Sequence, residues 1–198
     1  INLINPQNPQ HRIEAITAEN KDNYPIDFIG ALAYDSINNG MWIGANQGLF
    51  FYDLKHKQLC SPFANRAAED IRGCIGSIID KNGQLWIGCL DGVYIIDLHS
   101  RPASSSDGVF RYRHLKYKLD DPSSGLIEKI CCFYEAQDGI LWLGSNGYGI
   151  YKCMQDERGE VQFICYNSLH GLPDNSIRGI LEDDKGYIWI ATNNGLSR

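Results

Sequence analysis

The sequence has no long apolar run and no excess of basic residues. Its hydrophobic stretches stay far below the roughly 20 residues of a membrane-spanning helix; they are short, as in Val93–Ile96, and suit buried strands. Acidic residues outnumber basic ones by 24 to 18, which gives a net charge of -6. This balance argues against nucleic-acid binding, which usually needs a basic face. Hydrophobic residues still make up 43% of the 198 residues, so the chain is globular rather than disordered.

Motifs that carry catalysis or bind metals are also missing from the sequence. The five histidines are scattered, and no His-Glu-x-x-His, Gly-x-Ser-x-Gly or phosphate-binding loop occurs. Asp183 and Asp184, which precede Gly186, lack the alternating ligands and the closing Glu of a calcium loop. We therefore expect no catalytic residue, no metal site and no cofactor in this chain.

Cysteine is plentiful, but its usual functional spacing is absent. Seven cysteines leave at least one thiol unpaired, and the lack of any Cys-x-x-Cys excludes the commonest zinc and redox spacings. Most of them stand where a strand needs a small apolar residue, and we interpret them that way. Disulfides stay open, because an extracytoplasmic setting would permit them. The cysteines are Cys60, Cys74, Cys89, Cys131, Cys132, Cys153 and Cys165.

What the sequence does contain is one repeat centred on tryptophan. The tryptophans recur at intervals of about 44 to 56 residues, each in a short apolar segment such as Leu85–Cys89. A glycine precedes each one by two or three residues, and another follows by six or seven. A tryptophan at one fixed place in every unit is best explained by packing between units, so we expect all four to be structural. They are Trp42, Trp86, Trp142 and Trp189.

The repeat unit predicts short antiparallel strands that are joined by tight turns. Asn-Gly, Asp-Gly and Lys-Gly pairs tolerate the positive φ that hairpins need. The runs between them are rich in Ile, Leu, Val, Tyr and Trp, as strands are. The second unit predicts strands near 72–80, 84–89 and 92–98, with a weaker fourth at Phe110–Leu115. Four-stranded units that recur about every 40–50 residues are typical of propeller blades.

We therefore predict an all-β chain, a β-propeller segment of about four four-stranded antiparallel blades. The expected blades are 27–66, 67–118, 119–170 and an incomplete fourth at 171–198. Residues 1–26 should supply an outer strand near Ile13, either to a preceding blade or to the fourth blade in a closed ring. Open ends of repeat arrays expose apolar surface. We thus expect blades to continue before Ile1 and beyond Arg198, and the isolated chain to self-associate.

The pattern Asp-x-x-Gly-x-(Leu/Ile)-Trp-(Ile/Leu)-Gly-x-x-x-Gly-Leu resembles the two-component regulator propeller repeat. Gly171–Asp183 is similar to that family's loop into its innermost strand, and Asp121–Ile127 is a weaker copy. The resemblance extends over residues from about 27 to 198. It departs from the family pattern at Ala191, where the family has Gly, and in the first turn, which is shifted by one residue.

This resemblance implies a non-catalytic sensor. Repeats of the family fill the periplasmic region of bacterial hybrid two-component systems, which continue into a histidine kinase and a DNA-binding response regulator. Members commonly sense carbohydrate breakdown products and signal to transcription. We thus expect this segment to lie on the periplasmic side of the inner membrane and to bind an oligosaccharide. The membrane anchor is expected outside the segment, which should not itself bind nucleic acid.

Ligand-binding residues are expected on one rim of the propeller, in the loops between second and third strands and in those that enter each innermost strand. These loops are rich in amides with some arginine, groups that suit hydroxyl-rich ligands and their carboxylates or sulfates. Asn and Asp are also common in turns for backbone reasons, so each position is a hypothesis. The candidates are Asn46, Arg72, Asp91, Glu128, Asn146, Tyr148, Arg178 and Asn193.

Two other functions stay open at this point. A protein-interaction scaffold, including self-assembly between sensor chains, would show an exposed apolar patch. A propeller lyase or lactonase would instead bring a histidine and acidic partners together on the central rim.

Overall fold

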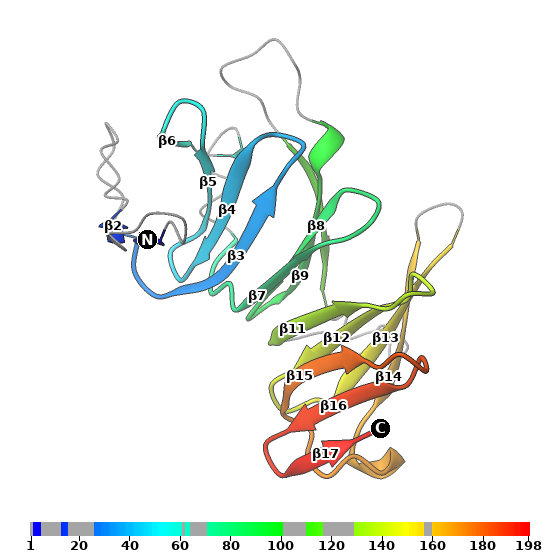
Figure 1. The fold of residues 1–198 in the computed structure, drawn as a ribbon. Coiled ribbons are helices and arrows are strands. Elements are labelled where there is room, and N and C mark those ends of the chain that lie inside the picture. The colour runs from blue at the N-terminus through cyan, green and yellow to red at the C-terminus, as the bar shows by residue number, and fades with distance from the viewer. Residues whose placement is uncertain are drawn as a thin grey trace.

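The computed structural model describes residues 2–4, 13–15, 26–60, 62–63, 71–100, 110–116, 129–156 and 160–198. Its strands form four successive antiparallel sheets and a separate two-stranded sheet (Figure 1). Within these residues, helix is confined to two short 3-10 turns, η1 (Leu98–Ser100) and η3 (Ser168–His170). The prediction of an all-β chain is confirmed.

Each of the first three sheets has four strands, and the fourth sheet has three. The first sheet contains β3 (Ile29–Asp35), β4 (Gly40–Ala45), β5 (Leu49–Asp53) and β6 (Gln58–Cys60). The second contains β7 (Gly76–Ile79), β8 (Gln84–Cys89), β9 (Gly92–Asp97) and β10 (Arg111–Leu115). The third contains β11 (Ile130–Glu135), β12 (Leu141–Ser145), β13 (Ile150–Gln155) and β14 (Val161–Tyr166). The fourth contains β15 (Ile177–Glu182), β16 (Ile188–Thr192) and β17 (Gly195–Ser197).

Within every sheet the strands lie side by side in chain order, and consecutive sheets meet along their first strands. β3 contacts β7, β7 contacts β11, and β11 contacts β15 (Figure 1). First strands that gather toward one axis, with later strands running outward, are the arrangement of propeller blades. The predicted β-propeller segment is therefore confirmed.

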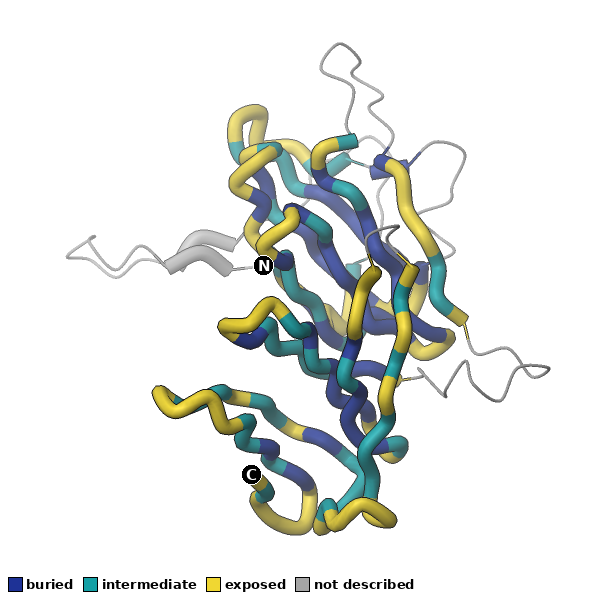
Figure 2. Tube along the Cα trace, turned by 90° about the vertical axis from the view of Figure 1, so that its right-hand side faces the viewer, coloured by how far each residue is buried: buried dark blue, intermediate teal, exposed yellow. Residues whose placement is uncertain are grey.

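The hydrophobic core lies between neighbouring sheets. Trp42 on β4 is fully buried and contacts Phe110, which precedes β10 of the next sheet, with ring centroids 4.9 Å apart. Trp86 is buried in the next interface, in one cluster with Leu143 and Tyr151 of the third sheet. Figure 2 shows buried residues concentrated in the first three sheets, while the fourth is more exposed. Burial thus depends on a following sheet that covers the strands.

Close approach of neighbouring first strands requires a small residue. A Cβ added to Gly76 on β7 would lie 2.5 Å from the carbonyl oxygen of Cys131 on β11. That is far inside van der Waals contact, so glycine sets the spacing of the second and third sheets at this point.

Positive φ values occur at the hairpins that the sequence marked as turns. In the hairpins from second to fourth sheet, Gly83, Gly139 and Gly186 have φ of 71°, 84° and 80°. In the first sheet Asn39 takes φ of 51° instead, and it lies three residues before Trp42 just as these glycines lie three residues before their tryptophans. Asn tolerates this left-handed region, which explains the one-residue shift of the first turn.

A buried or half-buried carboxylate holds the indole ring in three of the four sheets. The bonds run from the indole Nε1–H of Trp42 to Asp35 (3.0 Å), of Trp86 to Asp80 (2.9 Å) and of Trp189 to Asp183 (2.8 Å). In the third sheet Ala136 stands at the position of these aspartates, and Trp142 is half-buried. In three units a hydrogen bond therefore joins an aspartate of the first hairpin to the central tryptophan, and the third unit lacks this bond.

The segment around Ile13 does not extend the fourth sheet. Here β2 (Ile13–Ala15) pairs with β1 (Asn2–Ile4) in a sheet of its own, and the fourth sheet has its edge at β17. The closed ring that we considered is therefore not the arrangement of this structure. The residue boundaries that we drew between blades stay a prediction.

Candidate ligand-binding rim

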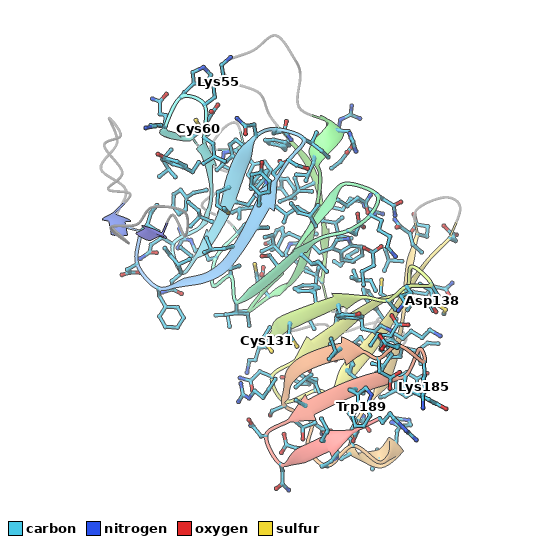
Figure 3. All side chains as sticks on the ribbon, in the orientation of Figure 1. Lys55, Cys60, Cys131, Asp138, Lys185 and Trp189 are labelled. Carbon is cyan, nitrogen blue, oxygen red and sulfur yellow. The ribbon has the colours of Figure 1, made fainter. Side chains whose placement is uncertain are left out.

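The loops that were expected to bind a ligand lie at one end of the sheets, joined by backbone hydrogen bonds. Gly73 N–H donates to Asn46 O (3.2 Å), which links the second sheet's entry segment to the first sheet's β4–β5 loop. Gly147 N–H donates to Asn175 O (3.2 Å) in the same way between the third and fourth sheets. Figure 3 shows Cys131 at this end of β11, and Asp138 and Lys185 in hairpins at the opposite end. We call this end the rim.

Arg178 and Asn193 are the two predicted residues that the structure brings together through side chains. Arg178 lies at the start of β15 and is exposed, and its Nε–H donates to Asn193 Oδ1 at 2.5 Å. Asn193, in the β16–β17 turn, is held by its backbone N–H, which donates to Ser176 O (3.1 Å). This contact fixes Nε and leaves the guanidinium beside an exposed amide. The pair can bind a carboxylate and a hydroxyl at once.

Asp91 is engaged with the outer part of its own sheet. Tyr94 Oη–H donates to Asp91 Oδ2 (3.1 Å), and His114 Nε2 on β10 lies 3.4 Å from the same carboxylate oxygen. The Tyr94 and His114 rings stack with centroids 3.7 Å apart. Burial raises the pKa of Tyr94, and so does Asp91. Burial also lowers the pKa of His114, which Asp91 opposes by favouring the imidazolium.

The remaining predicted residues are spread over the rim. Asn46, Arg72 and Asn146 are exposed. Tyr148 is half-buried and packs against the core between the second and third sheets, so less of its ring is available to a ligand. Glu128 lies outside the described residues. Whether any of these residues binds a ligand stays a prediction.

Two functional groups at the rim were not found from the sequence. Cys131 and Cys132 are half-buried at the start of β11, where the register of the β11–β12 pair shifts between Ile130 and Cys132. The repeat could have pointed to them, since Cys131 stands where the fourth unit has Arg178. A strand bulge leaves no mark in the composition, so the sequence alone did not separate these thiols from packing residues.

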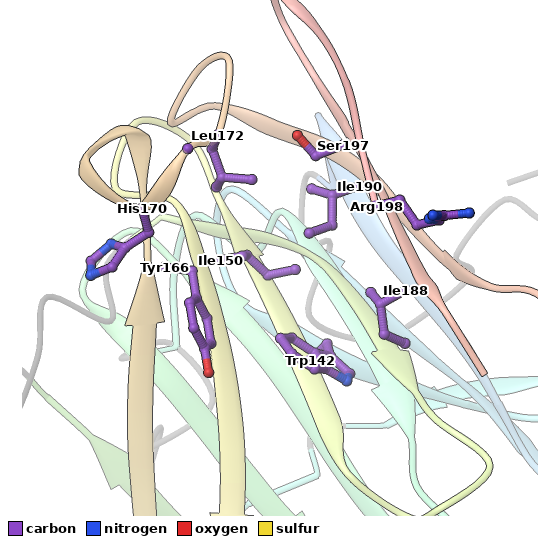
Figure 4. Close-up of a pocket in the computed structure, with 10 residues that line it drawn as sticks. Trp142, Ile150, Tyr166, His170, Leu172, Ile188, Ile190, Ser197 and Arg198 are labelled. Atoms are coloured by element: carbon purple, nitrogen blue, oxygen red, sulfur yellow. The ribbon is translucent and has the colours of Figure 1, made fainter.

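A cavity of about 420 Å³ lies between the third and fourth sheets, and Leu172 of the loop that enters β15 also lines it (Figure 4). Trp142 and Ile150 line it from the third sheet, and Ile188 and Ile190 from the fourth. At the first interface the corresponding tryptophan, Trp42, is covered by Phe110 beside an outermost strand. The described part of the fourth sheet has no such strand, which accounts for the space beside Trp142.

Comparison with known proteins agrees with this geometry. Residues 171–194 match the family model of the two component regulator propeller. This segment carries the two-component regulator propeller repeat. The matched segment contains Arg178, Asn193 and the β15–β16 turn at Gly186, so the rim pair lies within it.

Solved structures share the fold. An extracellular domain assigned to a hybrid two-component system of B. thetaiotaomicron is 24% identical with a TM-score of 0.71, over 96% of this chain and 23% of that one. PorZ, a surface component of the type-IX secretion system of Porphyromonas gingivalis, is 17% identical with a TM-score of 0.64, over 96% of this chain and 28% of that one. Virginiamycin B lyase from Staphylococcus aureus is 16% identical with a TM-score of 0.54, over 96% of this chain and 60% of that one.

This chain thus spans only a part of the length of such proteins. This chain covers about a quarter of the length of the sensor domain and of PorZ. No curated protein gives a significant match. Among the described residues, no helix has the length and apolarity to cross a membrane. In the same residues, no group of three or more His, Cys, Asp or Glu side chains is placed to hold a metal ion.

Proposed function

We propose that this chain is a non-catalytic, ligand-recognising segment of the extracytoplasmic region of a hybrid two-component sensor. The match of residues 171–194 to the two-component regulator propeller carries this proposal. The likeness to extracellular domains of such systems supports it. Signalling to a histidine kinase and to transcription, and a periplasmic location, belong to the same proposal.

The ligand that we propose is an oligosaccharide with an acidic group. The Arg178–Asn193 pair offers a guanidinium and an amide that are already oriented, and Arg72 adds a second exposed cation at the rim. Fixed donors favour carboxylate or sulfate geometry, and exposed amides bind hydroxyl groups.

Isothermal titration with uronic-acid oligosaccharides and with neutral oligosaccharides of equal length tests this ligand class. We expect binding of the acidic set, weakened by about tenfold or more in Arg178→Ala, because a hydrogen bond to a charged group contributes about 1.5–3 kcal/mol. Lys185→Ala removes an exposed cation from the opposite end and should leave binding unchanged. Equal losses in both variants would show that net charge, and no rim site, governs the interaction.

A scaffold function is favoured by one further observation, the exposed apolar side chains on the first and last sheets. The residue after the second glycine of the repeat is fully buried in the first three units, at Leu49, Val93 and Ile150, while its counterpart Leu196 is 62% exposed. At the other end of the array, Leu32 and Tyr34 on β3 are exposed. We propose that these two faces join copies of this chain, first face against last, when the segment is isolated.

A further inference from the structure

A β-bulge recurs at the start of the innermost strand, and in the third and fourth blades the extra residue of the bulge carries a thiol or a guanidinium group. The strand register shifts between Ile130 and Cys132 in β11 and between Ile177 and Gly179 in β15. Cys131 and Arg178 are the extra residues of these two bulges. Bulges redirect side chains and often occur beside functional sites. Here they place a thiol and a guanidinium at the same level of adjacent strands.

The thiol of Cys131 is held against the fourth sheet and against a second thiol. Cys131 Sγ lies 3.4 Å from Ile177 O and 3.5 Å from Gly144 O. Cys132 Sγ also packs against Gly144, because a Cβ added to this glycine would lie 2.4 Å from that sulfur. Both sulfur atoms therefore gather around Gly144, whose missing side chain leaves them room.

The surroundings of Cys131 favour its thiolate. Hydrogen bonding from the Cys132 thiol lowers the pKa of Cys131, burial opposes this, and the Arg178 guanidinium lowers it further, to about 7. The same contact with Cys131, together with burial, raises the pKa of Cys132. Two other strands contact Cys131, β12 through Gly144 and β7 through Gly76, and neither residue carries a charged side chain. A half-exposed thiolate beside a cation is the setting of reactive cysteines.

The other close pair of thiols has a different environment. Cys74 and Cys89 have sulfur atoms 3.5 Å apart, but both residues are fully buried. Contact with Cys74 and burial raise the pKa of Cys89. Cys153 is also buried, and burial raises its pKa to about 12. Burial shields these three thiols from reagents, and the raised pKa of Cys89 and of Cys153 keeps those two thiols protonated at neutral pH, so selectivity favours Cys131.

We propose that Cys131 is a thiol-modification site for small anionic disulfides, with Cys132 and Arg178 as its positioning residues. The Cys131 thiolate attacks one sulfur of a disulfide R–S–S–R. One S–S bond forms between Cys131 and R–S, the original S–S bond breaks, and the second R–S leaves as a thiolate. The adduct's carboxylates then lie beside Arg178, on the rim. This site does not depend on oligosaccharide binding.

The probe for this proposal is 5,5′-dithiobis(2-nitrobenzoate), an anionic disulfide, with release of its coloured thiolate followed at several pH values. We expect one thiol per chain to react about tenfold faster than the half-buried Cys60, since rates rise with the thiolate fraction. Peptide mapping should place that adduct on Cys131. The reaction rate of Cys131 should already be near its plateau at pH 8, whereas that of an unperturbed cysteine, with a pKa of about 8.5, would still be rising.

Variants separate the positioning role from general damage to the fold. Arg178→Ala should slow the Cys131 reaction several-fold and move its pH profile upward, with Cys60 unchanged as an internal reference. Cys132→Ser keeps a hydrogen-bond donor and should retain the profile, while Cys132→Ala should move it upward. An adduct that forms first on Cys60 or Cys165, or an Arg178→Ala profile identical to the parent's, would overturn the proposal. Thermal melts identify any variant that is unfolded.

Discussion

The bond between the central indole and an aspartate is the residue-scale feature that most clearly ties sequence to fold. Asp80 is buried, and its carboxylate accepts from the indole of Trp86 and from the backbone N–H of Asn82 (3.0 Å) and Gln84 (2.8 Å). One side chain therefore closes the β7–β8 hairpin and fixes the ring that packs on the next blade.

Asp80→Ala is expected to lower the free energy of unfolding by about 1–3 kcal/mol, because it leaves a buried indole N–H without its acceptor. Urea denaturation would measure the change. Asp138→Ala is the matched control in the third hairpin, since Asp138 is exposed and accepts from only one described backbone N–H, that of Ile140. Equal losses in the two variants would contradict a special role for the aspartate–indole bond.

Trp86→Ala should cost more, about 3–5 kcal/mol, because it empties a packed interface between two blades. The loss at Trp189 should be smaller, since that ring is only half-buried on the last sheet. Denaturant melts of both variants give the comparison. A change below about 0.5 kcal/mol for Trp86→Ala would mean that the ring is not part of a core.

At the scale of elements, the spacing of first strands depends on the size of a residue near the start of each strand. Gly76→Ala would place a methyl group 2.5 Å from a carbonyl oxygen of β11, and the sheets would have to move apart. We expect a loss of about 1–3 kcal/mol, as for other overpacked sites. Gly179 occupies the same place in β15, where a Cβ would meet no atom within 4 Å. Gly179→Ala should therefore leave the urea midpoint almost unchanged, and a loss equal to that of Gly76→Ala would argue against stacked first strands.

Hairpins and strand order could be predicted from the sequence because they depend on neighbours a few residues apart. Around Trp86, the turn glycines predict the two hairpins, and the apolar runs between them predict the order of β7, β8 and β9.

Contacts between distant positions could not be predicted in this way. The partner of Asp91 is His114 on the outermost strand, 23 residues away, and no motif links them. Cys131 and Cys132 approach Arg178 only because two strand bulges coincide in neighbouring blades. The sequence identified Arg178 and Asn193 as separate rim candidates, but their contact depends on the geometry of the β16–β17 turn.

On the scale of the whole molecule, apolar side chains are exposed at each end of the array, Leu32 and Tyr34 on the first sheet and Leu196 on the last. We expect the isolated chain to sediment as a concentration-dependent mixture of monomer and larger species. Leu196→Lys places a charge on the last face and should shift the mixture toward monomer, since edge charges oppose strand association. Leu169→Lys is the control, because Leu169 is 90% exposed in η3 and is not at the repeated packing position. A strictly monomeric parent chain, or equal effects of both variants, would contradict association through these faces.

The central claim is that consecutive units are blades stacked first strand to first strand around one axis. Nuclear Overhauser spectra of the labelled chain test it most directly, through proton pairs that only stacking brings together. We predict cross-peaks between the α-protons of Gly76 and Cys131, because a Gly76 Cβ would lie 3.3 Å from the Cys131 Cα, and between Cys131 and Ile177 across the next interface. Sheets with intact cross-strand contacts but no cross-peaks between β7, β11 and β15 would contradict the account.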